Sequence, residues 1–125
     1  GISCGVANAR FAKPLDMELL TRIVAATPRI LTLEEHLEIG GFGAGVLEAF
    51  HDAGLPTERL KVHAIADQVI DHSPQLQQRH NLKLDVEGVV AKVLAVFPDL
   101  GHAAGKGPAS DGSLKEKKFA ETVTW

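Results

Sequence analysis

An apolar segment that ends in two carboxylates and a glycine-rich turn most constrains the fold of this chain. The segment Arg29–Leu33 has the composition of a buried strand and is followed at once by Glu34 and Glu35. The turn Gly40-Gly-Phe-Gly43 comes next, and an amphipathic segment follows it over 44–53. Glycine fits such a turn because backbone passes close to backbone where a strand leads into a helix. Strand, glycine turn and helix in this order predict a parallel α/β unit.

Apolar periodicity and end signals predict the elements around this unit. Asp accepts hydrogen bonds from free amides at a helix start, so Asp16 and Asp85 are predicted N-caps. Gly54, followed by a proline two residues later, is predicted to end the second helix. We therefore expect a three-layer α/β fold, a mostly parallel sheet flanked by helices. The further strands are predicted over 2–9 and 61–66, and the further helices over 16–27, 73–80 (capped by Ser73, with Pro74 in its first turn) and 85–97, the last with a continuous buried stripe.

Composition excludes several classes of protein. The 125 residues are 45% hydrophobic and 23% charged, which fits one domain with one core. The net charge of −3 gives no reason to expect nucleic acid or an anionic membrane as a partner. No apolar run approaches the roughly 20 residues of a membrane helix. The single cysteine, Cys4, excludes an internal disulfide and favours a reduced, cytoplasmic location.

The two ends of the chain differ from its middle. Residues 1–100 are predicted to form the domain, and residues 101–125 a tail whose first part is rich in Gly, Ala, Ser and Pro. We expect the tail to pack on a neighbouring surface, with Trp125 as its anchor. Because the chain begins inside a predicted strand, we expect it to be part of a longer polypeptide, with at least one strand and one helix before Gly1.

Three groups of residues are candidates for chemistry, and each also has a structural explanation. The turn 40–45 could bind an anion, but it lacks the Lys and Ser/Thr of a phosphate loop, so tight strand–helix packing is favoured. Glu34, Glu35 and His36 could act as acid–base groups. Neighbours on a strand point to opposite faces, so an interface or a capping role is favoured.

The third group could form a metal site, but its spacing matches no zinc pattern and a polar loop is favoured. Its four residues are His63, Asp67, Asp71 and His72. Cys4 has no activating partner in the sequence and is interpreted as a small apolar strand residue.

Three motifs in order carry a resemblance to a known family. The segments 8–16, Asn-Ala-Arg-Phe-Ala-Lys-Pro-Leu-Asp, 30–36, Ile-Leu-Thr-Leu-Glu-Glu-His, and 40–45, Gly-Gly-Phe-Gly-Ala-Gly, resemble the C-terminal domain of the transketolase-like thiamine diphosphate enzymes. Within that family they are most similar to the 1-deoxy-D-xylulose-5-phosphate synthases. Residues 65–72 and 81–85 also fit, although Ala66 and Ser73 stand where that branch usually has Pro and Gly. The resemblance covers residues 1 to about 98.

The resemblance implies a division of labour within a larger enzyme. The family's first two domains hold thiamine diphosphate, Mg2+ and the acid–base residues, and the third builds the homodimer and supports the second. The implied reaction condenses pyruvate with D-glyceraldehyde 3-phosphate to 1-deoxy-D-xylulose 5-phosphate and CO2. No catalytic, cofactor-binding or metal-binding residue is thereby assigned to this chain, which is expected to be inactive alone. The residues expected to be architectural or interfacial are Lys13, Pro14, Asp16, Glu34, Glu35, Gly40, Gly41 and Gly43.

Two alternative functions stay open at this stage. The β subunits of 2-oxoacid dehydrogenases share the Pro-Leu-Asp, Glu-Glu and Gly-Gly features, although the segment 67–85 argues against them. A stand-alone module is the other alternative. It would bind an anion at the glycine turn or a protein through the aromatic tail.

Overall fold

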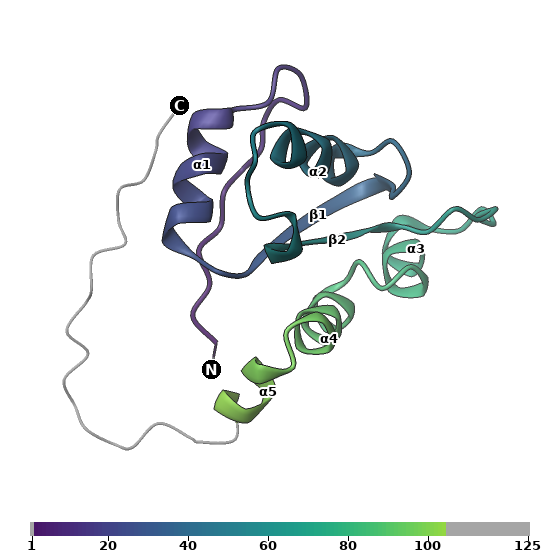
Figure 1. Ribbon diagram of the computed structural model, residues 1–125. Coiled ribbons are helices and arrows are strands. Elements are labelled where there is room, and N and C mark those ends of the chain that lie inside the picture. Colours follow the sequence, from purple (N-terminus) through teal and green to yellow (C-terminus); the bar gives the residue numbers. More distant parts are fainter. Residues whose placement is uncertain (1, 105–125) are drawn as a thin grey trace.

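Two parallel strands lie at the centre of the structure, a computed structural model that describes residues 2–104 (Figure 1). Strand β1 (Ile30–Leu37) pairs with β2 (Leu60–Ile65), with Ile30 opposite Leu60 and Leu33 opposite His63. The pairing is irregular between Leu33 and Leu37 and resumes where Leu37 meets Ile65. Because this pairing continues past the two glutamates, β1 ends four residues later than the apolar segment predicts. The predicted α/β class is confirmed.

Helices cover both faces of the strand pair. On one side lie α1 (Met17–Ala26) and α2 (Phe42–Asp52), and on the other α3 (Gln75–Asn81) and α4 (Val86–Val96) (Figure 1). The order of elements is therefore helix, strand, helix, strand and then helices. The short 3-10 helix η1 (Thr57–Arg59) leads into β2, and α5 (Asp99–Ala104) follows α4 and runs past residue 100.

The helix ends follow the predicted signals. Asp16 accepts a hydrogen bond from the Leu19 amide at 2.9 Å and starts α1. Asp85 accepts from the Gly88 amide at 2.9 Å and starts α4. After α2, Gly54 adopts the left-handed conformation with φ of +67°, which only glycine adopts without cost. Its amide donates to the His51 carbonyl at 3.1 Å and the Leu55 amide donates to the Phe50 carbonyl at 2.8 Å, as in a Schellman motif. The predicted caps at Asp16 and Asp85 and the predicted helix end at Gly54 are confirmed.

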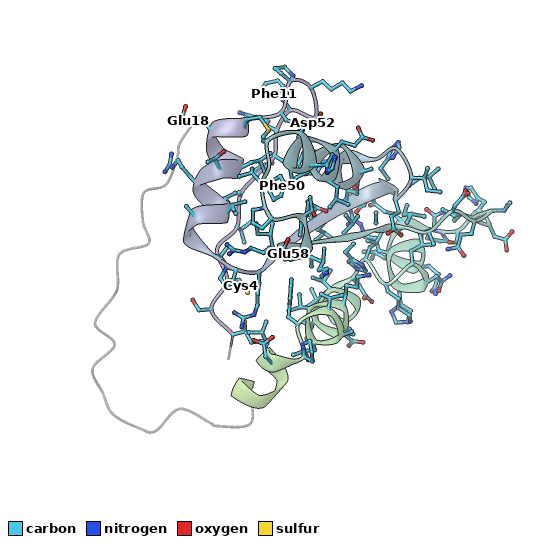
Figure 2. All side chains as sticks on the ribbon, viewed as in Figure 1. Cys4, Phe11, Glu18, Phe50, Asp52 and Glu58 are labelled. Atoms are coloured by element: carbon cyan, nitrogen blue, oxygen red, sulfur yellow. The ribbon has the colours of Figure 1, made fainter. Side chains whose placement is uncertain are left out.

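The hydrophobic core lies between α1, α2 and the beginning of the sheet. Phe50 is fully buried at its centre (Figure 2). Burial of a Phe side chain stabilises a fold by about 1.5–3 kcal/mol. Val24 from α1, Val46 from α2 and Leu60 from β2 complete the buried cluster. The apolar stripe predicted for α2 therefore faces the core, although Leu47 is only partly buried.

Three local predictions are wrong. Residues 2–9 form no strand, because none of the described strands pairs with them, and Val6 is 95% exposed. Apolar composition alone does not supply the backbone partner that a strand needs. The stripe of α4 is not continuously buried, since Val86 and Val90 are exposed and only its end, Phe97, is buried. Ser73 is not the N-cap of α3, because the helix begins one residue later, with Pro74 as its N-cap and Gln75 as its first residue.

The connection between α3 and α4 is held at several points, and we call residues 82–85 the α3–α4 joint. Lys83 has a φ of +60°, which is uncommon for a residue with a side chain. The buried His63 of β2 donates from Nε2 to the Lys83 carbonyl at 2.7 Å. Gly88 of α4 packs so closely on the Lys83 backbone that no Cβ would fit. The joint therefore ties both helices to the sheet.

None of the helices within residues 2–104 is long and apolar enough to cross a lipid bilayer.

Two glycines in the first turns of α2 offer a matched test of the packing on the sheet. A Cβ on Gly43 would lie 2.6 Å from Thr32 Oγ1 and 2.7 Å from Val62 Cγ1, whereas a Cβ on Gly45 would meet open space. We expect Gly43→Ala to lower the free energy of unfolding by about 1–3 kcal/mol through overpacking. Gly45→Ala should raise it by about 0.5–1 kcal/mol through helix propensity. Urea unfolding measures both, and equal effects at the two positions would contradict this packing.

Candidate functional site

The amino end of α2 already holds an anion that belongs to the chain itself. The Phe42 amide donates to Glu34 Oε2 and the Gly43 amide donates to Glu34 Oε1, both at 2.7 Å. Free amides and the helix dipole make a helix start attractive to negative charge. Since each carboxylate oxygen takes one amide, an external anion would have to displace Glu34 from this place.

The glycines of the turn bring α2 close enough for this contact. A Cβ on Gly41, the N-cap of α2, would lie 2.5 Å from Glu34 Oε2. Gly43 is buried against Thr32 and Val62. Gly40, at the bend itself, has a φ of +72°. The turn thus serves close packing of helix on strand, the explanation that the sequence favours over an anion site.

Glu35 lies on the opposite face of β1 from Glu34. It accepts a hydrogen bond at 2.6 Å from Nε of Arg79, which belongs to α3. Both side chains are well exposed, so this ion pair contributes at most about 1 kcal/mol. His36 is exposed, and its Nδ1 lies 3.3 Å from the Leu37 carbonyl oxygen. The two glutamates therefore diverge and form no acid–base pair.

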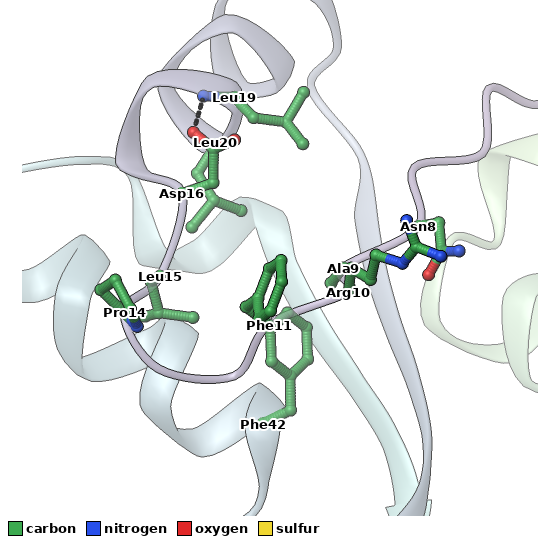
Figure 3. A pocket seen from close by; sticks show the side chains of 10 residues that line it. All are labelled: Asn8, Ala9, Arg10, Phe11, Pro14, Leu15, Asp16, Leu19, Leu20 and Phe42. Carbon is green, nitrogen blue, oxygen red and sulfur yellow. Dashed lines mark hydrogen bonds between the residues drawn. The ribbon is translucent and has the colours of Figure 1, made fainter. Parts of the chain in front are cut away.

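The Lys13–Asp16 segment borders an apolar pocket of about 160 Å³ (Figure 3). The Lys13–Pro14 peptide bond is cis, and Lys13 itself is exposed. Asn8, Arg10 and Asp16 are the polar residues of its lining, and the carboxylate of Asp16 accepts a hydrogen bond from the Leu19 amide. This pocket was not predicted from the sequence, although Phe11 in the segment 8–16 and Phe42 in the segment 40–45 could have indicated it. Its lining includes Phe11, Pro14, Leu15, Leu19, Leu20 and Phe42.

The residues of the possible metal site do not come together. His63 is buried and bonded to the Lys83 carbonyl, whereas Asp67, Asp71 and His72 are exposed in the segment before α3. Within the part of the chain that the structure describes, no three His, Cys, Asp or Glu side chains are placed to hold a metal ion. Cys4, predicted as an apolar strand residue, is instead exposed on the extended N-terminal segment (Figure 2).

The carboxyl group of Asp85 has a lowered pKa. The hydrogen bond from the Gly88 amide, and then the one from the His80 ring at 2.7 Å, hold the pKa of Asp85 below its ordinary value of 3.8. Both donors stabilise the ionised form. Asp85 is a helix cap at the α3–α4 joint, so the shift reports a structural role rather than catalysis.

Comparison with known proteins identifies a family and several relatives. The family described as "Transketolase, C-terminal domain" matches residues 1–89. The 1-deoxy-D-xylulose-5-phosphate synthase 1 of Geobacter sulfurreducens is 39% identical over 104 residues, which are 83% of this chain. The 1-deoxy-D-xylulose-5-phosphate synthase of Syntrophus aciditrophicus is 41% identical over 97 residues, or 78% of this chain. The chain spans only 16% and 15% of the length of these two relatives.

Removal of the Glu34 carboxylate should destabilise the chain more than removal of its neighbour. Glu34→Ala leaves two helix-start amides without their acceptor, and we expect a loss of about 0.5–2 kcal/mol in the free energy of unfolding. Glu35→Ala is the matched control and should cost less than about 1 kcal/mol, with an effect that falls as salt is added. Urea unfolding at two ionic strengths compares them. An equal cost for both variants would show that the cap does not stabilise α2.

The lowered pKa of Asp85 predicts a stability difference that depends on pH. Its stabilisation is fully present above the unfolded pKa near 3.8 and is lost as the pH falls through the lower folded value. The gap between wild type and Asp85→Asn should therefore shrink as the pH falls below about 4. The control is Asp67→Asn, because no described residue bonds to that exposed carboxylate. Thermal unfolding across this pH range measures the gap, and a gap that widens in acid would overturn the assignment.

Proposed function

This chain belongs to the transketolase C-terminal domain family, and on that basis we propose that it is the C-terminal portion of a 1-deoxy-D-xylulose-5-phosphate synthase. The whole enzyme would be a cytoplasmic transferase that condenses pyruvate with D-glyceraldehyde 3-phosphate and releases CO2, for isoprenoid and thiamine biosynthesis. The carrying observation is the 39–41% identity to synthases over about four fifths of the chain. Both relatives named above are synthases, which favours this function over a 2-oxoacid dehydrogenase subunit or a stand-alone module.

We assign thiamine diphosphate and Mg2+ to the remainder of the enzyme. A diphosphate group needs free amides or cations, and the amides of the glycine turn are bonded to Glu34. The described residues also lack a cluster of metal-ligating side chains. The described residues therefore do not fit the cofactor. We assign the chemistry that the cofactor supplies to the rest of the enzyme.

Assembly and support are the roles proposed for this portion. Residues 1–100 would form the domain and residues 101–125, which lie almost wholly outside the described part, a tail with its own contacts. β1 is hydrogen-bonded along one edge only among the described strands, and Leu33 on it is half exposed. Such an edge and face are suited to pairing with further strands of a larger sheet and to the homodimer. The glycine turn and the helix caps would act through this architecture.

The proposal is tested by comparing the 125-residue chain with the intact enzyme that contains it. We expect the intact enzyme to form 1-deoxy-D-xylulose 5-phosphate from the two substrates when thiamine diphosphate and Mg2+ are added, and the chain alone to form none. Denaturing intact-mass spectrometry first establishes which polypeptides each sample holds. Turnover by the chain alone, or transfer to a lipoyl acceptor by the intact enzyme, would contradict the proposal.

Gly41→Val separates an architectural role from a chemical one. A side chain at this N-cap would collide with the Leu37 carbonyl and the Glu34 carboxylate. We expect turnover and the fraction of dimer, measured by sedimentation, to fall in parallel by at least tenfold. A collapsed kcat with unchanged dimerisation would place this turn in the catalytic machinery instead.

A further inference from the structure

The segment between β2 and α3, residues 66–74, extends away from the rest of the chain, and we call it the β2–α3 arm (Figure 1). It contains no helix or strand, and residues 66–72 are all exposed. Its most exposed apolar side chain is Val69, at 96%, and the neighbouring Ile70 is also exposed. The arm therefore presents Val69 on a segment whose contact with α3 is a hydrogen bond from Gln78 to the Asp71 carbonyl.

Further exposed apolar side chains surround the root of the arm. The Glu38 amide donates to the Ile65 carbonyl at 2.8 Å, which places the loop after β1 beside the point where the arm begins. Ile39 in that loop and Leu76 at the start of α3 are 71% and 78% exposed. Ile39 and Leu76 thus lie in segments that adjoin the base of the arm, at the carboxyl end of the strands, where α/β proteins usually place ligands and partners. A single exposed apolar residue has little meaning, but such a grouping marks an interaction surface.

The end of β1, the loop after it and the arm carry carboxylates and two histidines, His36 and His72. Residues 36–41 and 66–74 contain Glu38, Asp67 and Asp71 but no Lys or Arg. Among residues 2–104, no ion pair neutralises these three carboxylates, and the nearby Arg79 is paired with Glu35. A complementary partner is therefore apolar at its centre and basic at its rim. A second copy of the same surface would place carboxylates against carboxylates.

The root of the arm is fixed although its tip is free. Gln78 of α3 donates from Nε2 to the Asp71 carbonyl at 3.3 Å, and Pro74 restricts the backbone where α3 begins. A partly ordered arm loses less conformational entropy on docking than a disordered one. An arm with a fixed base and an exposed tip is suited to insertion into a groove of a partner.

We infer that the β2–α3 arm docks on the thiamine-binding portion of the synthase, with Val69 in an apolar groove bordered by Lys or Arg side chains. The inference rests on the proposed function and adds to it the surface and the chemistry of the contact. Val69 is the anchor, and Asp67 and Asp71 set the orientation of the arm and favour cations at the rim.

Hydrogen–deuterium exchange in the intact enzyme and in the 125-residue chain tests this docking. The amides of residues 67–72 donate no hydrogen bond within the described residues, so they should exchange rapidly in the chain alone. We expect exchange at least tenfold slower in the intact enzyme. Val69→Asp should return it to the rate of the isolated chain and reduce turnover. The control Val86→Asp, at an 80% exposed position of α4, should change either rate less than twofold.

Each other outcome overturns the inference and is distinguishable from failure of the proposed function. An active intact enzyme with rapidly exchanging arm amides, or with protection that Val69→Asp leaves intact, removes the docking role and keeps the synthase. Protection that appears in the isolated chain as its concentration rises assigns the arm to a contact between copies. An intact enzyme without turnover of pyruvate removes the proposed function and, with it, the docking partner.

Discussion

The bond between Glu34 and the amino end of α2 is the constraint on which the rest of the structure depends. It joins the end of β1 to the start of the helix that buries Phe50, so the strand, the turn and the core are fixed together. Gly41 and Gly43 are required because the helix must approach the strand closely for the bond to form. The glycine turn resembles an anion-binding loop, but its amides bind the Glu34 carboxylate of the same chain.

Glu35 connects the same strand to the helices on the other side of the sheet. Through Arg79 it contacts α3, while Glu34 contacts α2, so two adjacent residues on β1 connect to opposite layers. Alternation along a strand requires this divergence. It also explains why two neighbouring carboxylates at the carboxyl end of a strand need not form a catalytic pair.

The sequence predicts best the features that are encoded locally. The Asp16 and Asp85 caps and the Gly54 helix end depend on a few neighbouring residues and were predicted at the right positions. Residues 2–9 were misassigned because a strand depends on a distant partner, which composition does not reveal. At the candidate site, the opposite directions of the two glutamates followed from strand geometry. The pairing of Glu35 with Arg79, 44 residues away, had no local signal.

The α3–α4 joint makes three distant positions depend on one another as sequences diverge. The left-handed Lys83 is held by the His63 side chain and by the absence of a side chain at Gly88. Loss of the imidazole would release the carbonyl, and a side chain at position 88 would push the turn away. Related proteins that change one of these residues should therefore change another, so that positions 63, 83 and 88 vary as a set, although they belong to a strand, a turn and a helix.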